Sequence, residues 1–197
     1  AIKLARAYTG KQYIAIPKQH PFFSFDDWFI SKTPLVKGTQ ENSGIYTLLF
    51  DYNDIDSLED LFDKYRNQIA AVMLEPATSI VPKPYDDDEL DFLPISKKRK
   101  NHFLNQIRSL CTKNNSLLII DEMITGFRWD NLGAANYFDI KADLITFGKG
   151  IANGFSLSAL GGKKEIMELG STSVKGKERV FLLSTTHGAE MGSLGAF

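Results

Sequence analysis

Cysteine is nearly absent from this chain, since Cys111 is the only one among 197 residues. A scaffold held together by disulfides is therefore excluded. Cys111 follows Leu104, Ile107 and Leu110 at helical spacing, which predicts a thiol buried in the core.

Long apolar runs and an excess of one charge are also missing. No apolar stretch approaches the roughly 18 residues of a membrane-spanning helix, and no cationic start precedes an apolar core as in a secretory signal. The 23 basic and 24 acidic residues give a formal net charge of −1, which does not indicate a nucleic-acid-binding surface. We therefore expect no membrane or nucleic-acid partner, and a location in the reducing cytoplasm.

Histidine is scarce and scattered. His20, His102 and His187 lie far apart and no Gly-x-Ser-x-Gly turn is present, so a serine hydrolase is not indicated. Asp121 and Glu122 are either metal ligands or ordinary carboxylates at a strand end. Neither a histidine-rich segment nor a second acidic cluster with ligand spacing accompanies them, so the metal site is the weaker hypothesis.

Strand-like and helix-like segments alternate along the chain. Apolar runs predict strands at 13–16, 69–74, 117–120, 142–147, 157–160 and 180–183. Amphipathic spacing predicts helices at 1–8, 56–65, 103–110 and 165–169, with Asp56 as the N-cap of the second. The alternation favours an α/β fold with a mainly parallel sheet flanked by helices.

Both ends of the sequence look like cuts within helices. Residues 1–8 begin without an initiator methionine or an N-cap, and residues 192–197 look like the first turns of a further helix. We therefore interpret residues 1–197 as an internal piece of a longer protein, with a single domain or part of one.

Two of the predicted strands end at ionisable residues. Residues 117–120 lead into Asp121, and residues 142–147 lead through Gly148 to Lys149. Neighbouring parallel strands would bring this acid and this amine to one crevice, at the edge where open α/β sheets bind ligands. A lysine that forms a Schiff base and an aspartate that keeps a pyridinium nitrogen protonated are the basic apparatus of pyridoxal phosphate chemistry. The plain alternative is a surface lysine in a glycine-rich turn.

Longer motifs surround these two residues. Residues 121–128 read Asp-Glu-Met-Ile-Thr-Gly-Phe-Arg, and residues 142–149 read Ala-Asp-Leu-Ile-Thr-Phe-Gly-Lys. Shorter motifs are Leu-Ala-Arg-Ala-Tyr-Thr-Gly-Lys at 4–11, Asp-Trp-Phe at 27–29, Leu-Glu-Pro at 74–76 and Gly-Gly at 161–162. Together they resemble the class III pyridoxal phosphate-dependent aminotransferases, and among these the glutamate-1-semialdehyde aminomutase-like branch. The family's hallmark Asp-Glu-Val-x-Thr-Gly-Phe-Arg differs here only at Met123.

The resemblance implies the large domain of a fold-type I pyridoxal phosphate-dependent transferase over residues 1–197, incomplete at both ends and without the small carboxy-terminal domain. It implies that Lys149 holds pyridoxal 5'-phosphate as a Schiff base and moves the substrate proton, and that Asp121 binds the pyridine nitrogen. Met123 would pack under the ring and Glu75 would lie at the edge of the site. Thr185 would bind the phosphate across the interface of a homodimer.

Three features depart from the family pattern. The family's Tyr-His-Gly segment, whose aromatic ring stacks on the cofactor, is replaced by residues 19–23, Gln-His-Pro-Phe-Phe. The Gly-Asn-Pro that follows the phosphate-binding threonine is Gly-Ala-Glu at 188–190. The phosphate-cradling Gly-Ser-x-x-Ala turn would precede Ala1.

The implied activity is transfer of an amino group from a small amino donor to an aldehyde or keto acceptor. Intramolecular transfer by a glutamate-1-semialdehyde 2,1-aminomutase is the first alternative. A non-catalytic remnant that keeps the fold is the second.

Overall fold

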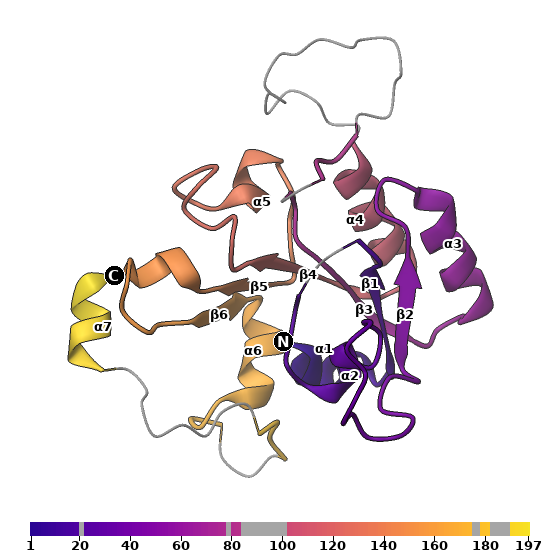
Figure 1. Ribbon diagram of the computed structural model, residues 1–197, viewed down its shortest axis with the longest axis horizontal. Coiled ribbons are helices and arrows are strands. Elements are labelled where there is room, and N and C mark those ends of the chain that lie inside the picture. Colours follow the sequence, from indigo (N-terminus) through magenta and orange to yellow (C-terminus); the bar gives the residue numbers. More distant parts are fainter. Residues whose placement is uncertain (20–21, 78–79, 84–101, 175–177, 182–189) are drawn as a thin grey trace.

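A six-stranded sheet forms the centre of the computed structural model, which describes residues 1–19, 22–77, 80–83, 102–174, 178–181 and 190–197 (Figure 1). The spatial order is β2-β1-β3-β4-β5-β6. The first five of these are parallel and β6 is antiparallel to β5. The predicted α/β fold with a mainly parallel sheet is thus confirmed. The strands are β1 (Tyr13–Pro17), β2 (Thr47–Phe50), β3 (Ile69–Leu74), β4 (Leu117–Glu122), β5 (Leu144–Phe147) and β6 (Ala159–Gly162).

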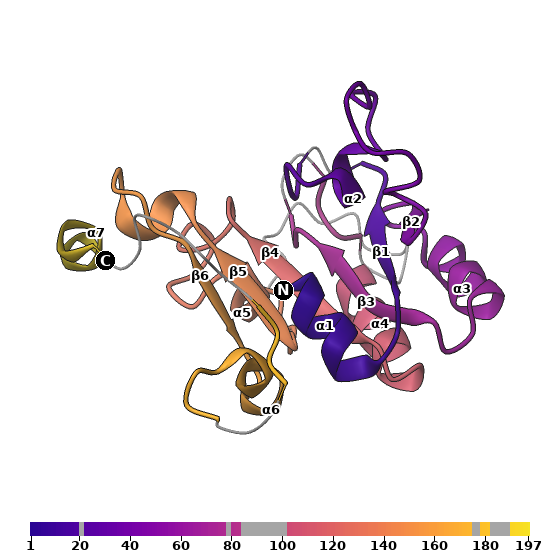
Figure 2. The same ribbon diagram turned by 90° about the horizontal axis from the view of Figure 1, so that it is seen from below.

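Helices cover both faces of the sheet (Figures 1 and 2). One face carries α3 (Ile55–Lys64), α4 (Phe103–Lys113) and α5 (Ala134–Tyr137), and the other carries α1 (Ile2–Thr9) and α6 (Lys164–Met167). The remaining elements are α2 (Asp27–Ile30), the 3₁₀ helices η1 (Lys149–Ala152) and η2 (Glu168–Gly170), and α7 (Met191–Ala196). Within the described residues, no helix is long and apolar enough to cross a bilayer.

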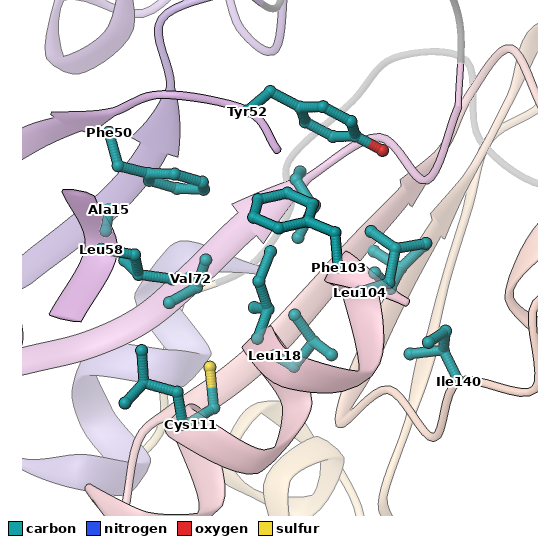
Figure 3. Close-up of a cluster of buried hydrophobic side chains, with 14 of the residues drawn as sticks. Ala15, Phe50, Tyr52, Leu58, Val72, Phe103, Leu104, Cys111, Leu118 and Ile140 are labelled. Atoms are coloured by element: carbon teal, nitrogen blue, oxygen red, sulfur yellow. The ribbon is translucent and has the colours of Figure 1, made fainter. Parts of the chain in front are cut away.

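The larger core cluster lies between the sheet and helices α3, α4 and α5 (Figure 3). Val72 of β3 and Leu118 of β4 meet Leu58 of α3 and Leu104 of α4, and each of these four side chains is at most 1% exposed. Cys111 of α4 is fully buried here, as predicted, and burial raises the pKa of its thiol to about 12. This thiol is therefore a packing group rather than a nucleophile.

On the opposite face, α1 packs against β3. All six residues of β3 are buried, and Ala71 faces Leu4 and Ala5 of α1. Small side chains on both elements allow the helix to approach the strand closely. Gly10 then ends α1 in the left-handed conformation, at φ 69°, and its N–H donates to the Arg6 carbonyl oxygen.

The structure corrects the predicted start of α3. The N-cap is Asp54, not Asp56, and its side chain accepts a hydrogen bond from Ser57 N at 3.2 Å. Two aspartates compete for this position, and Ser57 decides between them, because its hydroxyl also donates to the Asp54 carbonyl oxygen at 2.8 Å. Asp56 becomes an acidic residue of the first turn.

Several strand predictions also change. The expected strand at 157–160 begins two residues later, as β6, and runs antiparallel to β5. The prediction at 180–183 is wrong for Val180 and Phe181, which lie outside any strand; the rest of that segment lies outside the described residues. Neither β2 nor α5 was predicted, and each is only four residues long. Residues 82–100 form a proline-broken, highly charged segment, which the sequence predicts to be a solvated loop that leads into a helix. All but the first two of these residues lie outside the described ones.

Candidate functional site

The carboxyl ends of β4 and β5 lie side by side and open onto a cavity. Asp121 pairs with Thr146 and Glu122 pairs with Phe147 across these two strands. The cavity has a volume of about 490 Å³. Its walls include Asp121, Met123, Thr146, Phe147, Met73 and Phe23.

Asp121 is the buried charge of this cavity. It is 3% exposed, and its Oδ1 accepts a hydrogen bond from Met123 N at 2.8 Å. Burial raises the pKa of Asp121, and the Met123 N–H, the Thr146 hydroxyl and the positive charge of Lys149 offset this only in part. A carboxylate held in this way strongly favours a cationic or N–H-bearing ligand, because such a ligand restores the solvation that burial removed.

Lys149 follows β5 and begins η1. Its backbone is left-handed, with φ 47°, and its side chain is exposed. Lys149 is not part of the cavity wall, although its charge acts on Asp121 at the same edge of the sheet. The residue before it, Gly148, is buried against Met123, and a Cβ at Gly148 would lie 2.6 Å from Met123 Sδ. Because Gly148 has no side chain, the Met123 side chain can pack against it between the ends of β4 and β5.

The other predicted site residues are placed less centrally. Glu75 directly follows β3 and is 2% exposed, but it does not line the cavity. The charge of Glu75 instead acts on Tyr52: burial and this charge together raise the pKa of the Tyr52 hydroxyl. The Tyr52 hydroxyl donates to the Pro76 carbonyl oxygen at 2.8 Å. Thr185 lies outside the described residues.

Three further residues line the cavity but were not predicted from the sequence, namely Thr146, Phe147 and Phe23. The pairing of parallel strands was the signal for the first two, since they lie opposite Asp121 and Glu122. Phe23 belongs to the segment that departs from the family pattern. In that segment Gln19 is tied elsewhere: its amide donates to Asp51 Oδ1 at 2.9 Å and accepts from Tyr52 N at 2.9 Å.

A metal centre at Asp121 and Glu122 is not supported. No group of three potential ligands from His, Cys, Asp and Glu occurs within the described part of the chain. Glu122 instead accepts hydrogen bonds from Thr125, Ala134 and Ala135.

A mainly parallel sheet with one antiparallel edge strand and helices on both faces is the fold of the fold-type I pyridoxal phosphate-dependent transferases. Solved members share the architecture. A transaminase with bound PLP superimposes over 99% of this chain and 44% of its own, with a TM-score of 0.77 and 22% identity. An ω-transaminase from Sphaerobacter thermophilus does so over 87% of this chain and 39% of its own, with a TM-score of 0.69 and 28% identity.

Sequence comparison narrows the class to one family. The family model for class-III aminotransferases matches residues 95–191. Glutamate-1-semialdehyde 2,1-aminomutases from Alkaliphilus oremlandii and Francisella philomiragia are 39% and 37% identical over 177 residues, which is 85% of this chain. The chain belongs to the class III aminotransferase family, as its motifs indicated. It spans 38% of the length of these two relatives.

Proposed function

We propose that the protein containing this chain is a pyridoxal phosphate-dependent aminotransferase that moves an amino group from a small donor to an aldehyde or keto acceptor. Residues 1–197 would belong to its large, cofactor-binding domain. The observation that carries the proposal is the buried carboxylate of Asp121, in a cavity at the carboxyl edge of β4 and β5 and within electrostatic reach of Lys149.

The residues at this edge fit the cofactor. The cavity volume of about 490 Å³ is within the range of small-molecule sites. Asp121 is buried and its Oδ1 accepts a hydrogen bond from Met123 N at 2.8 Å, so the carboxylate keeps lone pairs that can accept from a ring N–H. Pyridoxal 5'-phosphate supplies an electrophilic aldehyde carbon and a ring that accepts electrons from the bond being broken.

Each residue would do one task. Asp121 would accept a hydrogen bond from the protonated ring nitrogen and so keep that nitrogen charged. Lys149 would bind the cofactor through its ε-amine and would then carry the proton that leaves and returns to the substrate carbon. Met123 would pack under one face of the ring, and Phe23 would cover it in place of the family's stacking tyrosine. The position of Phe23 in the cavity wall supports this role.

Glu75 and Thr185 are part of the same proposal. Glu75 would lie at the edge of the site, and Thr185 would donate to the phosphate from the second subunit of a homodimer. Exposed apolar side chains around η1 and α7 support a partner on this side, namely Phe155 (57% exposed), Met191 (84%) and Phe197 (71%). A second copy of the protein would cover them. A cytoplasmic location completes the proposal, because the buried thiol of Cys111 has no partner for a disulfide in this chain.

The proposal is tested by the absorbance of the purified full-length protein. We expect a band at about 420 nm after addition of pyridoxal phosphate, stable to gel filtration. Lys149→Ala should abolish this band and the transfer of amino groups. Lys164→Ala is the matched control, because its side chain is 87% exposed on α6 and lies outside the cavity. A full-length protein without the band would contradict the proposal and favour the non-catalytic remnant.

Intramolecular transfer is a second candidate, favoured by the names of the relatives, which are glutamate-1-semialdehyde 2,1-aminomutases with 39% and 37% identity. An aminomutase would convert glutamate 1-semialdehyde without any added acceptor. A transaminase would require a separate carbonyl acceptor and would release a keto product. Turnover of the semialdehyde alone therefore distinguishes the two.

A further inference from the structure

Glu122 follows Asp121 on β4, and its side chain points to the opposite face of the sheet, where α5 lies (Figure 1). It is 1% exposed. Its Oε2 accepts hydrogen bonds from Thr125 Oγ1 at 2.9 Å and Ala134 N at 2.8 Å, and its Oε1 accepts one from Ala135 N at 2.7 Å. Hydrogen bonds to an ionised carboxylate are about twice as strong as neutral ones. The Glu122 carboxylate is therefore held firmly by protein groups, and we assign it a structural role rather than a ligand-binding one.

The loop of residues 123–133 closes on Glu122 from both ends. Gly126 donates its N–H to the Glu122 carbonyl oxygen at 2.9 Å, and a Cβ at Gly126 would lie 2.7 Å from that oxygen. Gly133, at φ 90°, approaches so closely that a Cβ would lie 2.6 Å from Glu122 Oε1. A side chain at either glycine would push the loop away from the residue around which it is built.

This loop also supplies walls of the cavity. Met123, its first residue, donates its N–H to Asp121 Oδ1 and fills the space beside Gly148. Phe127, further along, packs on Phe147 with ring centroids 5.5 Å apart. Both Met123 and Phe147 line the cavity. A shift of the loop would therefore displace the residue that hydrogen-bonds Asp121 and change the shape of the cavity.

We propose that Glu122 is a positioning residue for the cofactor: from the far face of the sheet, its carboxylate holds loop 123–133 so that Met123 and Phe147 keep the cavity in its binding shape. The inference rests on the proposed function. Glu122 touches no reacting atom and acts through the loop that it anchors.

The test compares Glu122→Gln with wild type in the full-length protein. The glutamine amide keeps the shape, but one of its two positions becomes a donor, so at least one of the three N–H and O–H donors loses its acceptor. We expect the dissociation constant for pyridoxal phosphate, measured by quenching of intrinsic fluorescence in the apoprotein, to rise about 10-fold or more, as for other residues that orient a binding group. We also expect faster hydrogen exchange at Gly126, Ala134 and Ala135 without cofactor.

Asp143→Asn is the matched control, since Asp143 is a buried carboxylate of the same strand pair that lies outside the cavity. It should lower the melting temperature but leave the cofactor dissociation constant within about twofold of wild type, an affinity change below about 0.4 kcal/mol. Thr125→Val removes a single donor from Glu122 and is milder. It should weaken cofactor binding about threefold, and it decides the matter if Glu122→Gln does not fold.

The outcomes separate the two proposals. Unchanged cofactor affinity in Glu122→Gln and Thr125→Val, beside a wild type that binds normally, would overturn the positioning role and leave the proposed function standing. A wild-type protein that does not bind pyridoxal phosphate would overturn both. Weaker binding in both variants, with the control unchanged, would support the inference.

Discussion

The strand pair β4–β5 carries a buried aspartate at each end, and the two are treated in opposite ways. At the amino end, Asp143 precedes β5 and is 2% exposed. It forms ion pairs with Arg108 Nη1 and Lys163 Nζ, both at 2.6 Å, and accepts a hydrogen bond from Leu118 N at 2.7 Å. At the carboxyl end, Asp121 is 3% exposed, accepts a hydrogen bond from Met123 N, and is influenced by the positive charge of Lys149.

The pKa shifts follow from this difference in partners. Burial acts to raise the pKa of both carboxyl groups. At Asp143, hydrogen bonds from Lys163 and Arg108 and from the Leu118 N–H outweigh burial, so the pKa is lowered. At Asp121 burial prevails and the pKa is raised. Equal burial of the same residue type therefore accompanies a structural ion-pair cluster at one end and the proposed cofactor site at the other, and the partners distinguish them.

The largest expected effect that tests the contrast between Asp121 and Asp143 is a loss of turnover when Asp121 is replaced. Asp121→Asn in the full-length protein removes the charge that would keep the ring nitrogen protonated. We expect a loss of at least about 10³-fold in kcat, or about 4 kcal/mol of transition-state stabilisation. Steady-state kinetics with an amino donor and a keto acid measure it. Activity within tenfold of wild type would contradict the role given to Asp121.

Removal of the other carboxylate should affect folding instead. Asp143→Ala leaves the Arg108 guanidinium, 19% exposed, without its buried partner, whereas Lys163, 53% exposed, turns to solvent. We expect a loss of about 3 kcal/mol in unfolding free energy, measured by urea denaturation. A loss below about 1 kcal/mol would mean that solvent replaces the ion pairs and that the ion-pair cluster is not structural.

The contribution of Asp143 to the unfolding free energy should decrease as the solution is acidified. Because the pKa of Asp143 is lowered in the folded state, its stabilisation is present above the pKa of an unfolded aspartate, about 3.9. It is lost as the pH falls through the folded value. The difference in unfolding free energy between wild type and Asp143→Asn should therefore be full at neutral pH and shrink in strongly acidic solution. Urea titrations at several pH values measure it; a difference that grows with acid would contradict the assignment.

The smallest effect has the opposite sign. The pKa of Asp121 is raised in the folded state, so its ionised form destabilises the apoprotein above that pKa, and the penalty is relieved as the pH falls. Asp121→Asn should therefore stabilise the cofactor-free protein, by about 1 kcal/mol, or roughly 2–4 °C in melting temperature. Calorimetry of the apoprotein measures it. The same substitution thus weakens function and strengthens the fold.

Much of the fold follows from local patterns. The run 69–74 is buried on both faces and became β3, and the helical spacing from Phe103 to Leu110 became α4. Short elements escaped prediction, since the four residues of β2 and of α5 are too few for a periodic signal. The N-cap of α3 was misplaced by two residues because two aspartates offered similar chemistry.

The candidate site was predicted in part. Asp121 and Met123 lie in the cavity wall, but Lys149 and Glu75 do not. Phe23 and Thr146 were missed, because one comes from a loop and the other depends on the register of β4 with β5. The role of Asp143 was also missed: within its motif it reads as one more charged residue, and the burial and three partners that define it come from α4, β4 and the start of α6.

The order of apolar runs predicted a mainly parallel α/β sheet, and the motifs around Asp121 and Lys149 indicated the family by resemblance, because alternation and short motifs are local properties of the chain. Which carboxylate is neutralised, which remains open to a ligand and which, like Glu122, anchors a loop was decided only by tertiary structure. The reason is that ion pairs and desolvation depend on groups brought together from distant parts of the sequence.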